Sequence, residues 1–257
     1  MAVLQAVHRG SARRLSAGDK YSLMTETELF DAVRRMRTEG RSPNEIARSL
    51  RVPRATISSL VRCIAKESSA DCRAGDLVGC WVSQGWSEAL DVDGHPSWPR
   101  GHRAEGCEGL ANVVVAREHR KSRISVCSYL VDTLCLGLKQ TIGPRIMGRE
   151  ELHNFNGALF GAYGRDPLLA PIELAQHLVF GAVEYARELG FEPSGEFSEC
   201  VGHLGLWIGP SAIRFGRSGR PVFVAGPYDD PIRIMQTLER SVGKGNFDYV
   251  VGLQDAV

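Results

Sequence analysis

The sequence predicts a two-domain chain, in which an N-terminal all-α trihelical unit with a helix-turn-helix precedes a larger α+β domain with antiparallel hairpins. Three observations lead to this expectation. Apolar residues recur at helical spacing up to residue 64, a small and polar aperiodic stretch covers residues 68–76, and separate β-branched and helical runs fill residues 77–257. A chain of 257 residues with 43% hydrophobic and 24% charged residues accommodates two globular domains.

The first predicted helix follows Thr25, which is a suitable N-cap. Glu28 stands at the capping-box position, and Gly40 lies just past the C-terminal end. The apolar stripe of this helix consists of Leu29, Val33 and Met36. Because a pair of short helices cannot bury its apolar face alone, we expect this helix to complete a trihelical domain over residues 22–67.

Two further helices are expected on either side of a tight turn at Val52 and Pro53. Ala47 supplies the small residue that lets them cross. Arg51 stands in the turn, where a left-handed backbone would cost about 1 kcal/mol for a residue with a Cβ. The apolar faces are Ile46, Ala47 and Leu50 in the first helix, and Ile57, Leu60, Val61 and Ile64 in the second.

This order of a small residue, a turn, an aliphatic residue and a serine resembles the helix-turn-helix modules of resolvases and recombinases. Ala47, Arg51, Ile57 and Ser58 carry the resemblance. The chain departs from the family at Arg51, where glycine is usual. The resemblance implies that the first domain binds DNA and places its second helix in the major groove.

The charge distribution favours the same function. Residues 1–67 contain 13 lysines and arginines against 7 aspartates and glutamates, whereas residues 68–257 contain 18 against 23. A net charge of +1 therefore conceals a basic N-terminal part. Cationic segments attract the phosphate backbone without reading its sequence, and the attraction weakens with salt.

Specific roles follow from position on the two helices. Arg54 lies near the start of the second helix, where its guanidinium can fork onto a guanine edge. Arg48 and Arg51 are expected to contact phosphates. For each arginine the alternative is an ordinary solvated surface position. The remaining candidates for DNA contact on the second helix are Ala55, Thr56, Ser58, Ser59 and Arg62.

Residues 1–21 show no sustained period and are expected to form a disordered basic arm. Arg13 and Arg14 could enter the minor groove from this arm, and a loose basic tail is the alternative. No apolar run reaches the roughly 18 residues of a membrane span, and His8 interrupts any signal-peptide core. Seven cysteines without local pairing indicate reduced thiols, so we expect a cytoplasmic protein located at the nucleoid.

The second domain contains two predicted hairpins. The β-branched runs 110–117 and 123–131 flank a polar stretch, which favours a hairpin. Apolar residues on both parities of the second run indicate a central strand that is covered on both faces. A second hairpin is expected where the runs 212–215 and 221–224 flank a turn at residues 216–220.

Four helices are predicted in the same domain, at residues 133–140, 149–160, 172–189 and 231–242. Asp230 is the expected N-cap of the last one, with proline at its first position. The helix at 172–189 has a continuous apolar stripe. The side chains expected to face water on that helix are Glu173, Gln176, Glu184 and Arg187.

Three segments of this domain resemble a widespread bacterial domain that carries no assigned activity. They are residues 109–117 (GLANVVVAR), 129–139 (YLVDTLCLGLK) and 185–193 (YARELGFEP). The resemblance implies one continuous domain over most of residues 77–250, and it implies no particular function.

One constellation could carry catalysis. Asp132, Cys135 and Lys139 would share a helical face if residues 133–140 were helical, with the lysine pairing the carboxylate and activating the thiol. The alternative is a buried ion pair beside a packing cysteine.

A metal site is a second possibility, and its ligands would be Cys80, His95, His102 and Cys107, although their spacing lacks the close pairs of structural zinc sites. Surface positions are expected for the isolated histidines His119, His153, His177 and His203.

We therefore expect a DNA-binding protein without a cofactor, either a transcriptional regulator or a nucleoid-associated factor. Because one helix-turn-helix buries little surface, specific recognition of duplex DNA requires a homodimer, formed through the C-terminal domain. That domain could also sense a small-molecule ligand or recruit a protein. Two alternatives remain: a protein-interaction scaffold, and a nuclease-like enzyme that uses Asp132, Cys135 or Lys139, or Asp229 and Asp230.

Overall fold

The computed structural model describes residues 26–71, 75–92, 95, 98–102, 109–162, 166–207 and 209–250. Within these ranges the chain forms seven α-helices and nine short or long strands, so it combines helices and antiparallel sheet as the sequence predicts. The basic arm at 1–21, with Arg13 and Arg14, and the predicted cap Thr25 lie outside the described residues.

Three helices at the N-terminal end form what we call the head: α1 (Glu26–Thr38), α2 (Pro43–Leu50) and α3 (Arg54–Asp71). α3 continues through residues 68–71, which the sequence analysis placed in a linker. That part of the prediction is wrong, because the segment from Arg54 to Asp71 lacks glycine and proline and so contains no residue that ends a helix. The buried core of the head consists of Val33, Met36, Ile46, Ile57, Val61 and Ile64.

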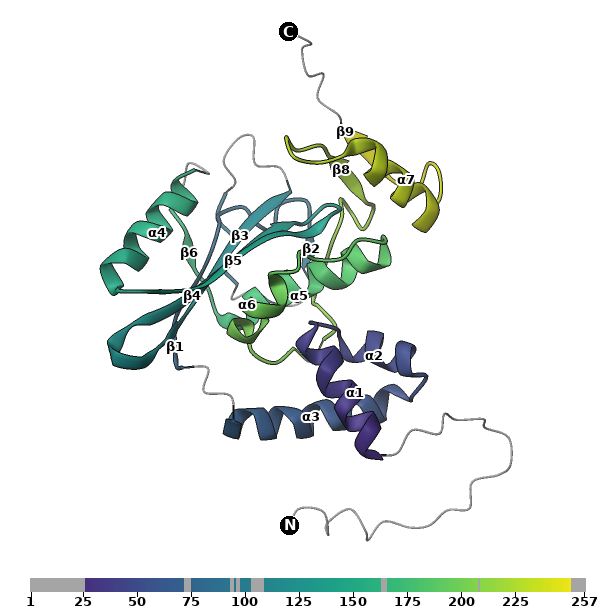
Figure 1. Cartoon of the computed structure of the whole chain (residues 1–257). Helices are drawn as coiled ribbons and strands as arrows, with labels where there is room; N and C mark the ends of the chain where they lie inside the picture. Colours follow the sequence, from purple (N-terminus) through teal and green to yellow (C-terminus); the bar gives the residue numbers. More distant parts are fainter. Residues whose placement is uncertain are drawn as a thin grey trace.

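The described residues from 75 to 250, here called the body, are built on a five-stranded sheet with strand order β5-β4-β3-β1-β6 (Figure 1). Every neighbouring pair in this sheet is antiparallel. β3 and β4 form the hairpin that the sequence predicts. The strands are β1 (Leu77–Val82), β3 (Leu110–Glu118), β4 (Ile124–Asp132), β5 (Gly137–Met147) and β6 (Leu168–Leu169), with a short 3-10 turn (Arg120–Ser122) between β3 and β4.

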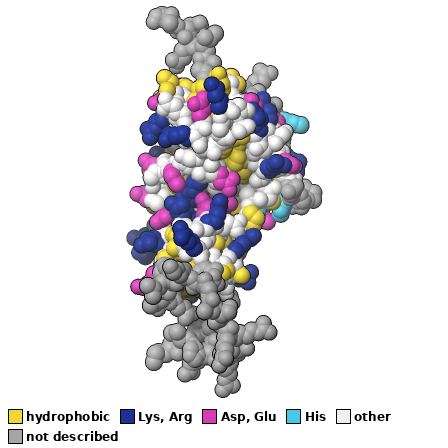
Figure 2. Space-filling model, turned by 90° about the vertical axis from the view of Figure 1, so that its right-hand side faces the viewer, with side chains coloured by type: hydrophobic (Ala, Val, Ile, Leu, Met, Phe, Trp, Pro, Cys, Tyr) yellow, Lys and Arg dark blue, Asp and Glu magenta, His cyan; other side chains and the backbone are white. Residues whose placement is uncertain are grey.

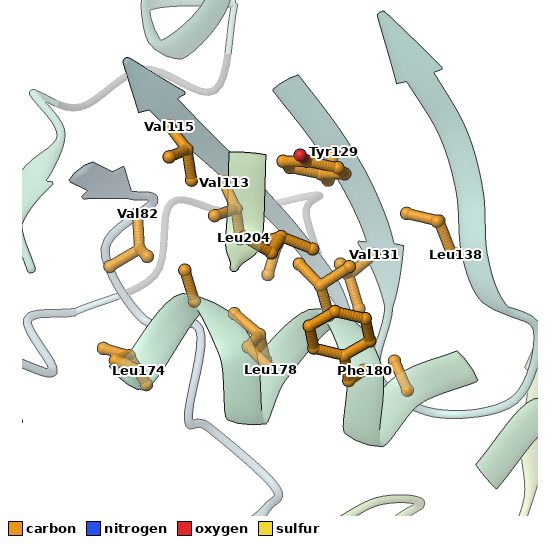
Figure 3. Packing of buried hydrophobic residues seen from close by; sticks show 14 of the residues in the cluster. Val82, Val113, Val115, Tyr129, Val131, Leu138, Leu174, Leu178, Phe180 and Leu204 are labelled. Carbon is orange, nitrogen blue, oxygen red and sulfur yellow. The ribbon is translucent and has the colours of Figure 1, made fainter. Parts of the chain in front are cut away.

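Helices cover both faces of this sheet. α5 (Ile172–Glu188) and α6 (Phe197–Leu204) lie on one face, where apolar side chains of α5 meet those of β3 and β4 (Figure 3). α4 (Arg149–Gly161) packs on the opposite face against Val114, Ala116 and Val126. β4 is therefore a central strand covered on both sides, as its composition predicts.

Two small sheets complete the body. β2 (Asp91–Val92) pairs with β7 (Ile213–Arg214), and β8 (Val222–Val224) pairs in parallel with β9 (Asp248–Val250). The predicted hairpin of 212–215 with 221–224 is therefore wrong: these two runs join different sheets, and between them Arg217 and Arg220 form an isolated bridge. The first run pairs with β2 and the second with β9, and the sequence pattern around a run does not indicate such distant pairings.

The predicted helix at residues 133–140 is also wrong. This segment forms a turn followed by the first residues of β5 instead of a helix. The Asp132 carboxylate accepts the backbone N–H groups of Leu134 and Cys135, which fixes a tight turn directly after β4. Gly137 then adopts a φ of 69°, and a Cβ at this position would lie 2.6 Å from the carbonyl oxygen of Ala182.

The other predicted helices are present as α4, α5 and α7 (Pro231–Ser241). Asp230 caps α7 by accepting the backbone N–H of Arg233 at 3.1 Å, as the sequence predicts. α7 packs on the β8–β9 pair through Leu238, Phe223 and Phe247. None of the helices in the described part of the chain has the length and apolar character needed to cross a membrane.

Candidate nucleic-acid interface

The start of α2 is fixed by its capping residues. Ser42 Oγ accepts the backbone N–H of Glu45 at 3.2 Å, and Glu45 Oε2 accepts the backbone N–H of Ser42 at 2.8 Å. Pro43 follows at the first helical position, where a missing N–H costs nothing. Ile46 is fully buried in the head core. These contacts set the direction in which α2 enters the turn.

The turn between α2 and α3 uses a left-handed residue. Arg51 adopts φ 55° and ψ 37°, and its N–H points back to the carbonyls of Ala47 and Arg48. Val52 donates its N–H to Ala47 at 3.1 Å. The strained position therefore falls where the sequence analysis places it. On the far side, the carbonyl of Pro53 accepts N–H groups from Thr56 and Ile57, which starts α3.

α3 has one buried face and one exposed face. Ile57, Val61 and Ile64 point into the head core. Arg51, Arg54 and Arg62 are exposed, and among the described residues they form neither ion pairs nor side-chain hydrogen bonds. We call the positions on the side opposite the head core, together with Arg51 in the preceding turn, the α3 stripe: Arg51, Arg54, Ala55, Ser58, Ser59 and Arg62. All of them are exposed except Ser58, which is half-buried. Thr56 is exposed at the edge of the stripe.

Arg48 differs from the other predicted DNA contacts. Its guanidinium lies 3.9 Å from Glu188 at the end of α5, and its side chain remains 68% exposed. Such a long, solvated ion pair contributes little free energy. Arg48 thus faces an acidic side chain of the body, whereas the α3 stripe does not.

The head contacts the body through the α1–α2 connection. The Arg187 side chain from α5 is 8% exposed, donates to the carbonyls of Glu39 at 3.1 Å and Gly40 at 3.4 Å, and lies 3.7 Å from a Glu45 carboxylate oxygen. Gly40 has a φ of 74°, and a Cβ there would lie 2.6 Å from the Phe197 ring. This close approach needs glycine.

A second polar group lies beside this contact. The Arg37 guanidinium donates to the carbonyls of Arg41 and Trp207, and the Trp207 indole N–H donates to Glu184. Burial raises the pKa of Glu184 to about 7, although the hydrogen bond from Trp207 opposes the shift. Burial lowers the pKa of Arg37 to about 10, and the carboxylates of Glu184 and Glu45 oppose it.

The sequence did not indicate this contact region, because Glu184 and Arg187 lie on the side of α5 that the periodicity of the helix assigns to water. That prediction is wrong for both residues, and also for Gln176, which donates to the carbonyls of Leu204 and Leu206. Residues of α1, α2 and their connection make the contacts described above, and in Figure 1 α3 runs across the lower part of the head, below α2. Figure 2 shows basic and acidic side chains intermixed on the face it presents.

The predicted catalytic constellation does not assemble. The Asp132 carboxylate accepts the backbone N–H groups of Leu134 and Cys135 in the turn described above. Burial raises the pKa of the Cys135 thiol, which disfavours a thiolate nucleophile. Lys139 bonds both carboxylate oxygens of Asp229 at 2.7 and 2.8 Å rather than pairing with Asp132. Asp230 caps α7.

The predicted metal ligands are also not gathered. Cys80 is buried, which raises its pKa to about 12, His95 stacks on Trp98, and His102 is exposed. Cys107 lies outside the described residues. In the part of the chain that the structure describes, no group of three or more histidine, cysteine, aspartate or glutamate side chains could hold a metal ion.

Two histidines are not at the surface positions expected of them. His177 Nδ1 accepts the backbone N–H of Ala212 at 2.9 Å, and its ring contacts that of Trp207. His203 Nε2 lies 2.8 Å from Ser125 Oγ. Burial lowers the pKa of both imidazoles. His119 and His153 are exposed as expected.

Comparisons with known proteins add no further assignment: no family model, no curated protein and no solved structure matches the chain.

Proposed function

We propose that the chain is a sequence-specific DNA-binding protein, which places α3 in the major groove and uses the body for oligomerisation, ligand sensing or partner recruitment. The observation that carries the proposal is the α3 stripe. Among the described residues, Arg54 and Arg62 are unpaired arginines on a helix whose opposite face is anchored in the head core, and the unpaired Arg51 stands in the turn just before this helix.

The dimensions of the stripe fit a groove. An α-helix with its side chains is about 10–12 Å in diameter, and the major groove of B-DNA is about 12 Å wide. The stretch of α3 from Arg54 to Arg62 is about 12 Å long. Arg54 is at the N-terminal end of α3, from which helix-turn-helix modules read base edges. Arg51 and Arg62 flank it and would contact phosphates.

The resemblance of Ala47, Arg51, Ile57 and Ser58 to resolvase and recombinase modules supports the same function. Ala47 lies in α2, Arg51 is the left-handed residue of the turn, and Ile57 and Ser58 lie in α3. A single helix buries too little surface for high specificity, so the proposal includes a homodimer on two half-sites. The nuclease-like alternative lacks comparable support, because both of its candidate carboxylates have structural partners. Asp229 accepts hydrogen bonds from Lys139, and Asp230 is the N-cap of α7.

The proposal is tested by titrating labelled duplex DNA with the full chain at several salt concentrations. Arg54→Ala/Arg62→Ala should weaken binding at least tenfold, since each arginine removes about 1 kcal/mol or more of interaction with bases or phosphates. The matched control is Arg233→Ala/Arg240→Ala, which removes the same charge from the exposed face of α7. Equal affinity of the two variants, with unchanged circular dichroism, would contradict the assignment of α3.

A further inference from the structure

The connection between β3 and β4 is strained, exposed and basic. Residues 119–123 (HRKSR), here called the basic tip, are all exposed. Lys121 and Ser122 both have a φ of 57°, a left-handed conformation that two-residue hairpin turns normally give to asparagine and glycine. Each such residue with a Cβ costs on the order of 1 kcal/mol.

The contacts of this turn that the structure shows are made by its two ends. His119 donates its N–H to the Arg123 carbonyl at 2.7 Å, which closes the turn. Arg123 lies 3.4 Å from Glu151 and donates to the carbonyl of Ile146 at 3.1 Å, so it is held by the body. Within the described ranges, the side chains of Arg120 and Lys121 make no hydrogen bond or ion pair. Two cations are thus held away from the body on a strained turn.

The basic tip lies at the end of the body that adjoins α3. Glu118, the residue before the tip, donates its N–H to the Asp76 carbonyl at 2.8 Å. Only three residues separate Gly75 from Asp71, the last residue of α3, so these two Cα atoms are at most about 15 Å apart. In Figure 1, β1 starts beside the C-terminal end of α3.

Chain connectivity sets an upper limit on the distance between the α3 stripe and the basic tip. Nine residues of helix from Arg62 to Asp71 span about 14 Å. Along the contacts described above, the path from Arg62 to Lys121 is at most about 50 Å, which corresponds to about one and a half turns of duplex DNA at about 34 Å each. A duplex that receives α3 in its major groove and continues toward the β3–β4 turn brings backbone phosphates to the tip.

From the strain, the two unpaired cations and the position beside α3, we infer that the basic tip is a second DNA contact, at which Arg120 and Lys121 bind backbone phosphates next to the groove that α3 occupies. This inference rests on the proposed function. Exposed Glu118 and Asp76 lie at the base of the turn and limit the attraction, so the contact involves few phosphates.

Two variants separate charge from turn geometry. Lys121→Asn/Ser122→Gly installs the residues that the turn favours and removes one cation. Ser122→Gly alone relieves part of the strain and keeps every cation. Both should fold and melt at or above the temperature of the unmodified chain, so a loss of DNA binding cannot be ascribed to unfolding.

The measurement is duplex affinity of the full chain over a range of salt concentrations. We expect Lys121→Asn/Ser122→Gly to lower the slope of log affinity against log salt by about one and the affinity at moderate salt about fivefold, and Arg120→Gln to do the same. Ser122→Gly should retain both values.

Three outcomes overturn the inference. Unchanged slopes in the two charge variants, while Arg54→Ala/Arg62→Ala still weakens binding, would refute the tip contact and leave the proposed function intact. A lowered slope in Ser122→Gly would show that the turn geometry, and not its charge, affects binding. Absence of duplex binding by the unmodified chain at the lowest salt would refute both proposals.

Discussion

Replacing Arg187 with alanine should detach the head from the body. The Arg187 side chain crosses the contact region, where it donates to two backbone carbonyls of the α1–α2 connection and lies 3.7 Å from Glu45. The Glu45 side chain is 12% exposed in this position. Alanine would leave the two carbonyls without this donor and the carboxylate without its nearby cation.

The magnitude follows from these contacts. A hydrogen bond with a charged donor contributes about 1.5–3 kcal/mol, and removing one partner of a buried ion pair costs about 3–5 kcal/mol. Glu45 keeps its hydrogen bond to the Ser42 N–H, and Arg187 also pairs with the more exposed Glu192, so we take the lower part of this range. The expected loss is about 3 kcal/mol in the free energy of unfolding.

The assay is urea denaturation of the full chain, followed by circular dichroism. Arg187→Ala should lower the unfolding midpoint, or separate a first transition of the head from that of the body. Arg233→Ala on the exposed face of α7 is the control and should change the free energy by less than about 0.5 kcal/mol. A loss below about 1 kcal/mol for Arg187→Ala, with a single transition, would refute the assigned role of this side chain.

Three further changes test other parts of the structure. The pKa of Glu184 is raised to about 7 in the folded state, so protonation of this carboxyl stabilises the fold. The free energy of unfolding should therefore fall by on the order of 3 kcal/mol as pH rises from 4.5 through 7. Glu184→Gln should flatten this pH dependence in urea titrations at pH 5 and pH 8. Gly40→Val introduces a Cβ at φ 74° against the Phe197 ring and should cost about 2 kcal/mol or more, whereas Gly157→Ala, whose Cβ meets no atom within 4 Å, should leave the melting temperature unchanged or raised. Asp230→Ala should cost about 1 kcal/mol by removing the cap of α7, and Asp230→Ser should restore most of the loss; an identical melting temperature for the two variants would contradict the capping role.

The sequence pattern was sufficient to predict an element where the spacing of residues within one segment agrees with the tertiary structure. The apolar stripe of α5, the β-branched runs of β3 and β4, and the Asp230 cap each follow from spacing within one segment. The resemblance to resolvase and recombinase modules singled out Arg51 as the turn position at which glycine is usual, and Arg51 has a left-handed backbone in the structure. In each case a neighbouring stretch of about ten residues contains the information.

Sequence pattern does not predict the structure where a residue far away in the chain determines it. Residues 133–140 contain apolar residues at helical spacing, but Asp132 caps a turn and Gly137 packs on α5, so the segment starts a strand. Glu184 and Arg187 are polar residues on the polar side of a helix, and only the position of the head makes them buried partners. No pattern within α5 indicates this.

The most direct test of the proposed function is selection from a pool of random duplex DNA by the purified full chain. We predict enrichment of a two-part motif with half-sites about one helical turn apart, lost when Arg54→Ala/Arg62→Ala is used in its place. Retention of DNA in a salt-sensitive manner without any motif would contradict sequence-specific recognition and would indicate coating of the nucleoid. No retention at any salt concentration would contradict DNA binding altogether.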